Sequence, residues 1–412
     1  MDPVKNINRL AYWTALAASP QWGGYACVWR PNAEVCYVAL GVDEVKSGDE
    51  LSTLDTIQHA GRYWFGFLSY DLKNRIEKLT TTRPHPMSFP GLLFFSPKLL
   101  VRIEQGKEEV LVDLTDGHWK NEKVTIEGIE LRKAFDWKLM QSRESYLEAV
   151  RQLKKHIQQG DIYEVNYCTA FETEAIIDHP LALFNVLNER TEAPYATFFS
   201  WPGRTVLCGS PELYLEKQDK RLISSPIKGT VKRGQTPPED EALARQLRED
   251  IKEQGENVMI VDLVRNDLSR IAATNSVVVD ELFGIYTFKT VHHMISTVSC
   301  MVRDGIGLSE IVKATFPMGS MTGAPKIRAM QLADQYEVIG RGIYSGSIGM
   351  ITPNGDFEWN VVIRSMLIDH EAHKAYCHVG GAITALCDEE KEYDECQLKA
   401  TAVLSIENLK YI

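Results

Sequence analysis

Two pairs of glutamates repeat the spacing E-x-x-E in the second half of the chain. Glu253 and Glu256 lie in one helical stretch, and Glu392 and Glu395 lie in another. A spacing of three residues places both carboxylates of a pair on one helix face. A divalent cation shared by the two helices would neutralise them, and Mg²⁺ prefers carboxylates together with water and substrate oxygens. The alternative is two solvated acidic faces, which arise readily by chance in a chain with 56 acidic residues.

Lys228 and Glu212 are of the types that nucleophilic and acid–base chemistry require. Lys228 is the single charge in the run PIKGT at 226–230. A poorly solvated lysine has a lowered pKa and becomes a nucleophile, although most lysines are simply solvated. Glu212 stands between Ser-Pro and the apolar run 213–215, and partial burial there would raise its pKa toward use as a general acid.

Arg364 and His293 are polar residues within apolar segments. Arg364 lies in the run VVIRSM at 361–366, which we expect to be a buried strand. A guanidinium there needs a partner, and either a substrate carboxylate or a structural salt bridge would supply it. His293 could donate a hydrogen bond in a pocket, and a satisfied core histidine is the alternative.

A glycine-punctuated loop, GSMTGAPK at 319–326, precedes an apparent helix at 327–335. Backbone N–H groups at a helix start form an anion site. The order of glycine, lysine and hydroxyl residues differs from that of a nucleotide-binding P-loop, so a carboxylate is a better guest than ATP. The alternative is a tight turn without a ligand.

The elements that must position these residues change character along the chain. Up to about residue 135, strand-like runs predominate, and we expect strands at 25–29, 35–40, 63–70, 91–100 and 110–114. Helices are predicted after the N-cap Ser142, ending near Gly160, and over 238–271 and 389–407. Further strands are predicted at 342–352, 361–368 and 375–384. The mixture lacks regular βαβ spacing, so the expected class is α+β with large sheets.

Composition excludes several classes of protein. The chain has 412 residues and a formal charge of −11, which argues against a partner with a phosphate backbone and so against nucleic acid. No apolar run approaches the ~20 residues that cross a bilayer, and the first residues lack a signal-peptide core. The eight cysteines are scattered, as expected of reduced, mostly buried thiols. We therefore expect a cytoplasmic protein without membrane contact.

Seven blocks of this sequence resemble those of the chorismate-utilising enzymes, the family of anthranilate, aminodeoxychorismate, isochorismate and salicylate synthases. The resemblance covers roughly residues 140–407, with a weaker match at 65–71. The blocks are GDIYEVN at 160–166, GSPE at 209–212, PIKGT at 226–230, ENVMIVDLVRND at 256–267, FPMGSMTGAPK at 316–326, RGIYSG at 341–346, and DE at 394–395 with KA at 399–400.

The resemblance implies a fold and a set of roles. The fold is a large orthogonal β-sandwich flanked by helices, with a β-rich N-terminal part at 1–135 interleaved with a chorismate-binding catalytic part at 136–412. Lys228 would be the nucleophile and Glu212 the general acid. Mg²⁺ would be held by Glu256 and Glu395, with Glu253 and Glu392 beside it. The residues expected to bind the carboxylates of the substrate are Tyr344, Arg364, Thr322, Gly323, Lys326, His293, Gly380, Gly381 and Lys399.

Two positions indicate which branch of the family the chain resembles. Lys228 stands where anthranilate-forming members have alanine and where aminodeoxychorismate-forming members have lysine. Glu164 stands where isochorismate and salicylate synthases have a lysine that activates water, and a carboxylate cannot take that role. The chain departs from the family at Ala382, where a third glycine is common, and at Leu386-Cys387, where Asp-Ser is common.

The resemblance therefore predicts an Mg²⁺-dependent aminase that converts chorismate and ammonia to 4-amino-4-deoxychorismate, the precursor of 4-aminobenzoate in folate biosynthesis. A glutamine amidotransferase partner would supply the ammonia, because the chain shows no Cys-His-Glu glutaminase signature. The alternatives are the first component of anthranilate synthase and a non-catalytic homologue that senses chorismate or tryptophan.

Overall fold

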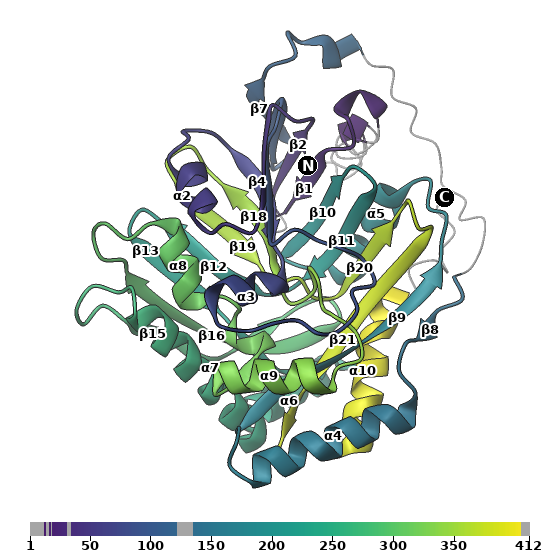
Figure 1. Ribbon diagram of the computed structural model, residues 1–412, viewed down its shortest axis with the longest axis vertical. Helices are drawn as coiled ribbons and strands as arrows, with labels where there is room; N and C mark the ends of the chain where they lie inside the picture. Colours follow the sequence, from purple (N-terminus) through teal and green to yellow (C-terminus); the bar gives the residue numbers. More distant parts are fainter. Residues whose placement is uncertain (1–11, 14–15, 18, 31–33, 122–134, 405–412) are drawn as a thin grey trace.

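Two large antiparallel sheets dominate the computed structural model, which describes residues 12–13, 16–17, 19–30, 34–121 and 135–404 (Figure 1). In these residues the first sheet has 11 strands in the order β17-β9-β21-β20-β11-β10-β1-β2-β6-β7, with β8 paired to β9. Its strands are β1 (Ala26–Trp29), β2 (Val35–Leu40), β6 (Leu99–Glu104), β7 (Lys107–Asp113), β8 (Lys138–Leu139), β9 (Glu164–Glu174), β10 (Tyr195–Trp201), β11 (Arg204–Ser210), β17 (Gly323–Ala324), β20 (Ser365–Asp369) and β21 (Lys374–Thr384).

The second sheet has 10 strands among the described residues, in the order β14-β16-β13-β12-β19-β18-β4-β5-β3, with β15 paired to β16. Its strands are β3 (Glu44–Gly48), β4 (Trp64–Leu68), β5 (Leu92–Ser96), β12 (Leu213–Gln218), β13 (Arg221–Ser225), β14 (Ile227–Lys232), β15 (Val278–Thr287), β16 (Val291–Met301), β18 (Ser347–Ile351) and β19 (Phe357–Asn360).

In the described part of the chain, three hydrophobic clusters join these layers. One contains aromatic side chains of both sheets, such as Phe67 of β4 and Phe199 of β10, whose rings meet edge to face at 5.7 Å. The second packs the first sheet against α4 (Arg143–Gln158), α5 (Pro180–Thr191), α9 (Lys326–Tyr336) and α10 (Glu389–Leu404). The third packs the second sheet against α2 (Ser52–Gln58), α7 (Ile251–Ser269) and α8 (Leu308–Thr315). The predicted α+β fold with large sheets and flanking helices is confirmed.

The helix predictions that rest on capping residues are confirmed, whereas the length of one predicted helix was wrong. The Ser142 side chain accepts a hydrogen bond from the Ser145 N–H at the start of α4, and Gly160 follows its end with φ +82°. The predicted helix at 238–271 is instead two helices, α6 (Pro237–Glu249) and α7. Asp250 ends the first in extended conformation and caps the second through its carboxylate. The end of the last predicted helix, 405–407, lies outside the described residues.

Two strand predictions were wrong in ways that matter for the site. The run at 91–100 is two strands, β5 in the second sheet and β6 in the first. Arg364 is not in a strand: its φ is +52°, and it lies in the segment between β19 and β20. Strands from the first 135 residues occur in both sheets, so this part of the chain contributes to both layers of the sandwich.

Candidate active site

Lys228 and Glu164 form an ion pair that joins the two sheets. Lys228 is the second residue of β14 in the second sheet, and Glu164 is the first residue of β9 in the first sheet. Their Nζ and Oε1 atoms are 2.6 Å apart, and the Glu164 side chain is 1% exposed. The pair is therefore a charge-assisted hydrogen bond shielded from water.

The charge state of Lys228 differs from the sequence prediction. Burial lowers its pKa, as expected, but the carboxylates of Glu164, Glu256 and Glu212 raise it more, and the net pKa is above the usual lysine value. The prediction of a lowered pKa was therefore wrong for this state of the protein. Lys228 is an ammonium here and must lose a proton before it can attack as a nucleophile.

Glu212 lies in the turn between β11 and β12, and its side chain is buried. Burial raises its pKa to about 7, although Ser320, Lys228 and the Ile227 N–H each lower it. A carboxyl group with such a pKa can hold a proton near neutral pH and donate it, which is the requirement for a general acid. The predicted rise in pKa through burial is confirmed.

Arg364 and His293 form a hydrogen-bonded pair. The Arg364 Nη2 lies 3.1 Å from His293 Nε2, and His293 Nδ1 lies 2.8 Å from Thr230 Oγ1. Burial and then Arg364 lower the pKa of His293 to about 3, so the ring is neutral. A guanidinium can only donate, so Nε2 accepts, and Nδ1 carries the proton that it donates to Thr230.

The Arg364 side chain is half-buried, and its guanidinium has no carboxylate partner among the described residues. Burial lowers its pKa, and Glu212 raises it by a smaller amount. In the described part of the chain, no carboxylate oxygen lies within ion-pairing distance of it. Of the two partners expected from the sequence, the structural salt bridge is thus not formed among these residues. An anionic ligand would compensate the charge.

Tyr344 lies close to the backbone that carries Arg364. The N–H of Ser345, the residue after Tyr344, donates to the carbonyl of Val362 at 3.0 Å. The Tyr344 ring is buried and stacks on His378, with 5.2 Å between centroids and 18° between planes. Burial raises the pKa of its hydroxyl far above the ordinary value, so Tyr344 is a neutral hydrogen-bonding group.

The four predicted metal-binding glutamates lie in the first half of α7 and of α10, close enough for their charges to interact. Burial lowers the pKa of Lys252 on α7, but its neighbours Glu256 and Glu253 and the α10 residues Glu392 and Glu395 raise it more. Burial raises the pKa of Glu253 and Glu256, and it raises that of Glu392 to about 7; other carboxylates add to each rise. Burial raises the pKa of Glu395, but Lys399 at 2.7 Å, together with Lys252 and Lys228, lowers it more, and the net pKa is below the usual value.

The four glutamates supply more negative charge than the two nearby lysines offset, and carboxylate oxygens suit a hard cation such as Mg²⁺. Among the described residues, no three Asp, Glu, His or Cys side chains converge to ligating distance. Lys252 and Lys399 lie against Glu256 and Glu395, at 3.7 Å and 2.7 Å. The donor chemistry thus fits Mg²⁺, and these ammonium groups offset part of the negative charge.

The loop at 319–326 is bound to β9 rather than open. The Asn166 N–H donates to Thr322 O at 2.9 Å, and β17 pairs with the start of β9. A Cβ on Gly323, which has φ +141°, would lie 2.2 Å from Glu164 O, so only glycine fits. The Thr322 N–H donates to Gly319 O at 3.1 Å, and it is therefore not free for the predicted anion contact.

Lys326 does not join the other site residues, contrary to prediction. Its Nζ lies 2.5 Å from Asp267 Oδ2 and 3.4 Å from Thr315 O. Asp267 is eleven residues beyond Glu256 on α7, which is ~16 Å at 1.5 Å per residue. Its partner therefore places the Lys326 ammonium near the other end of that helix, in a structural ion pair.

The predicted glycines in β21 allow close packing. A Cβ on Gly380 would lie 2.7 Å from both Cys168 Sγ and Tyr167 O, and one on Gly381 would lie 3.1 Å from Glu392 Oε2. Lys399 donates to Gly380 O at 3.1 Å while it pairs with Glu395. These residues thus hold α10 and its carboxylates against the strand next to β9.

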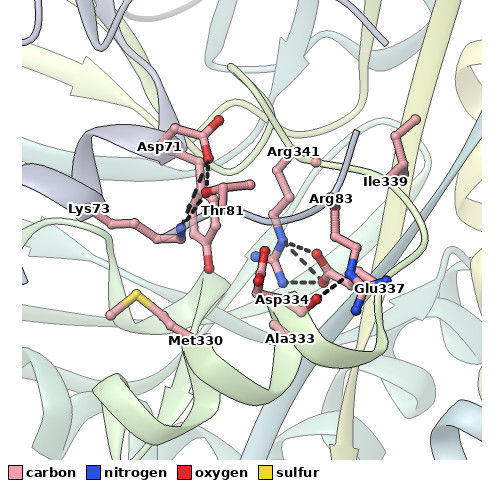
Figure 2. Close-up of a pocket in the computed structure, with 12 residues that line it drawn as sticks. Asp71, Lys73, Thr81, Arg83, Met330, Ala333, Asp334, Glu337, Ile339 and Arg341 are labelled. Carbon is pink, nitrogen blue, oxygen red and sulfur yellow. Dashed lines mark hydrogen bonds and ion pairs between the residues drawn. The ribbon is translucent and has the colours of Figure 1, made fainter. Parts of the chain in front are cut away.

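Sequence reasoning missed the buried pair Arg341–Glu337, which lies beside a cavity of about 10 Å³ with room for one water (Figure 2). The Arg341 Nη2 donates to Glu337 at 2.5 Å and to Asn166 O at 2.8 Å, and Nη1 donates to Met321 O at 2.7 Å. Arg341 therefore fixes both β9 and the loop before β17. Its place in the RGIYSG block was the available signal.

A family model described as chorismate binding enzyme matches residues 15–405. The chain belongs to this family. No helix in the described residues is long and apolar enough to cross a membrane. All eight cysteines are buried, as predicted.

The relatives include aminodeoxychorismate synthase component 1 of Bacillus subtilis, 30% identical over 88% of this chain and 85% of that protein. The chloroplastic aminodeoxychorismate synthase of Arabidopsis thaliana is 36% identical over 82% of this chain, which spans only 39% of that protein. Anthranilate synthase component I of Streptococcus pneumoniae has the same fold, with a TM-score of 0.82 at 23% identity over 90% of this chain and 92% of that one. The menaquinone-specific isochorismate synthase of Escherichia coli also shares it, with a TM-score of 0.79 at 18% identity over 96% and 91%.

Proposed function

We propose that this chain is an aminase of the aminodeoxychorismate synthase type, which converts chorismate and ammonia to 4-amino-4-deoxychorismate for the synthesis of 4-aminobenzoate and folate. The observation that carries the proposal is the position of Lys228, whose side chain is 11% exposed, is paired with Glu164, and has its pKa raised also by the charges of Glu256 and Glu212. Lysine in this block separates the resembled branch from its anthranilate-forming neighbours. The names of the Bacillus and Arabidopsis relatives support the same branch.

Substrate binding would depend on local positive charge, because chorismate is a dianion and the chain carries a net charge of −11. Arg364 is a half-buried cation without a carboxylate partner among the described residues, and it suits one carboxylate of the substrate. The neutral His293 accepts from Arg364 and so orients the guanidinium. Tyr344 would donate to the same carboxylate.

We propose that Glu256 and Glu395 bind Mg²⁺, with Glu253 and Glu392 beside them. The metal would neutralise the ring carboxylate and withdraw electron density from the ring, which eases loss of the 4-hydroxyl. Burial raises the pKa values of Glu253, Glu256 and Glu392, and neighbouring carboxylates add to each rise, so this group of acidic side chains supports a cation at this position.

The chemistry would then proceed in two displacements. Lys228, as the free amine, attacks C2 while the ring double bonds shift and the C4–O bond breaks, and Glu212 protonates the departing hydroxyl. Ammonia adds at C4, the double bonds shift back, and the C2–N bond to Lys228 breaks. One difficult substitution becomes two easier ones, and the product retains its enolpyruvyl group.

Product identification tests this function. The purified chain is incubated with chorismate, Mg²⁺ and ammonium, and the products are separated by mass. Aminodeoxychorismate without pyruvate is expected. Anthranilate with equimolar pyruvate would indicate an anthranilate synthase component instead, and absence of any turnover would indicate a non-catalytic homologue.

A second experiment tests the partner. Glutamine should support turnover only after a glutamine amidotransferase subunit is added, whereas ammonium should suffice for the chain alone. The word "component" in the name of the Bacillus relative supports a partner subunit. Glutamine-dependent turnover by the purified chain would contradict this part of the proposal.

A further inference from the structure

The proposed nucleophile is protonated, so the reaction needs a group that removes its proton. Lys228 donates to Glu164 Oε1 at 2.6 Å, the single hydrogen bond of its ammonium to a described residue. Glu212 cannot serve, because it must be protonated to release the hydroxyl group of the substrate. Glu164 therefore meets the geometric requirement for a base, which is contact with the proton that it removes.

The surroundings of Glu164 favour acceptance of that proton. Its side chain is 1% exposed, and its second oxygen, Oε2, is buried without a hydrogen-bond partner among the described residues. A buried carboxylate with one unsatisfied oxygen is poorly stabilised as an anion. Proton transfer from Lys228 discharges both members of the pair at once, without moving a charge into water.

The backbone holds Glu164 firmly in this position. Its strand is paired on one side with Ala324 of β17 and on the other with Thr384 of β21. Two residues along, the Asn166 carbonyl accepts from the buried Arg341, and the Asn166 N–H donates to Thr322 O. Glu164 thus lies on a strand that is paired on both sides and not on a free loop, so its carboxylate is held in place, as a reacting group requires.

We propose that Glu164 is a catalytic residue, which accepts a proton from Lys228 before attack and returns it when the lysine departs. The inference rests on the proposed function. In the first step an N–H bond of Lys228 breaks, an O–H bond forms on Glu164, and the freed electron pair forms the C2–N bond. When ammonia displaces the lysine, the C2–N electron pair returns to nitrogen and takes the proton back from Glu164, which restores the original ion pair.

Glu164 and Glu212 then have opposite roles in proton transfer. Glu164 is the carboxylate of the ion pair with Lys228, and Glu212, whose pKa burial raises to about 7, can hold the proton that it donates. One carboxyl group accepts while the other donates, in the same step. Two carboxyl groups set in different protonation states by their environments are a recurrent arrangement for acid and base assignments.

The test follows formation of the lysine adduct. Wild-type protein and Glu164→Gln are mixed with chorismate and Mg²⁺ without ammonia, quenched at set times, and measured by intact-protein mass spectrometry from pH 6 to 9. At pH 7 we expect Glu164→Gln to form the adduct about 10²- to 10⁴-fold more slowly, as for loss of a general base, with chorismate binding little changed.

The pH dependence separates a base from a structural residue. In Glu164→Gln the proton of Lys228 must leave to solvent, so the ratio of its rate to the wild-type rate should rise with pH. The titration of Glu212 is common to both proteins and cancels in this ratio. A ratio near one at pH 7, or a low ratio that does not change with pH, would overturn the proposal.

Two further variants complete the design. Glu164→Asp keeps a carboxylate one methylene shorter and should form the adduct faster than Glu164→Gln at pH 7; equal loss in both would overturn the proposal. Asp267→Asn removes the carboxylate from the other buried lysine pair and should leave the adduct rate unchanged. If wild-type protein forms no adduct, the covalent route of the proposed function fails as well; if it does and Glu164→Gln matches it, only the inference on Glu164 fails.

Discussion

Two largely buried lysine–carboxylate pairs among the described residues have the same chemistry and different surroundings. Lys228 contacts Glu164 at 2.6 Å, and Lys326 contacts Asp267 at 2.5 Å. Lys326 has a second acceptor in the Thr315 carbonyl, and its pair links the start of α9 to the end of α7. Lys228 has no second bond among the described residues, and its partner has an unsatisfied oxygen.

The two pairs also differ in the charged groups that surround them. The pKa of Lys228 reflects three carboxylates, Glu164, Glu256 and Glu212, which belong to different elements. Burial raises the pKa of Asp267 above its usual value, and the cations Lys326 and Arg270 offset only part of this rise. Bond length and burial alone thus do not distinguish the two pairs; the unsatisfied oxygen of Glu164 and the additional carboxylates around Lys228 do.

Lys228→Ala should have the largest effect on turnover. Loss of the covalent route should lower the rate with ammonium on the order of 10³-fold or more, equivalent to several kcal/mol in the barrier. Initial rates and intact-protein mass measure this, with thermal unfolding to confirm the fold. An unimpaired variant together with no adduct in the wild type would make Lys228 as structural as Lys326.

Lys326→Met should instead affect stability. Removal of one partner leaves the Asp267 charge buried, which costs about 3–5 kcal/mol. Denaturant unfolding measures the loss, and turnover per folded molecule should be retained. The double variant Lys326→Met/Asp267→Leu should recover most of the stability, because no buried charge remains; a double variant as unstable as the single one would refute the electrostatic explanation.

Glu256→Ala and Glu395→Ala should raise the Mg²⁺ concentration needed for half-maximal rate. Loss of a ligand should cost at least the 10- to 100-fold that loss of an outer-shell partner costs. Titration of activity with Mg²⁺ measures this, and Asp267→Asn is the matched carboxylate control, with no expected change. Near-wild-type activity of either alanine variant at limiting Mg²⁺ would remove these carboxylates from the metal site.

The pH profile should show the smallest effect. Glu212 has a pKa of about 7 and must be protonated to donate, so kcat/KM should fall about tenfold per unit as pH rises above about 7. Glu212→Gln should lose this limb along with most activity, whereas Lys326→Met should retain it. A flat wild-type profile up to pH 9 would assign the proton to another donor.

Much of the site was predictable because its signals are local. The Ser142 cap and the E-x-x-E pairs depend on residues three apart, and strand β2 depends on a run of six. The single charge in the PIKGT run pointed to Lys228. Such patterns need no knowledge of the rest of the chain, because backbone geometry fixes the spacing of neighbouring side chains.

The errors arose where distant segments meet. The run at 91–100 has a continuous strand pattern, yet its two halves pair with β4 and with β2 in different sheets. The stretch at 238–271 has a continuous helical pattern, yet Asp250 breaks it to cap α7. Propensity is a weak signal that tertiary packing overrides.

The sequence by itself determined which residues could react, the α+β class and the family to which they belong. The tertiary structure alone decided which carboxylate each lysine meets: Glu164, 64 residues before Lys228, and Asp267, 59 residues before Lys326. Pairing depends on the register of strands from two sheets and on where helices pack, which no local pattern encodes. Charge interactions fall off with distance and with solvent screening, so a few ångströms of packing separate the lysine that we propose as the nucleophile from the one that links two helices.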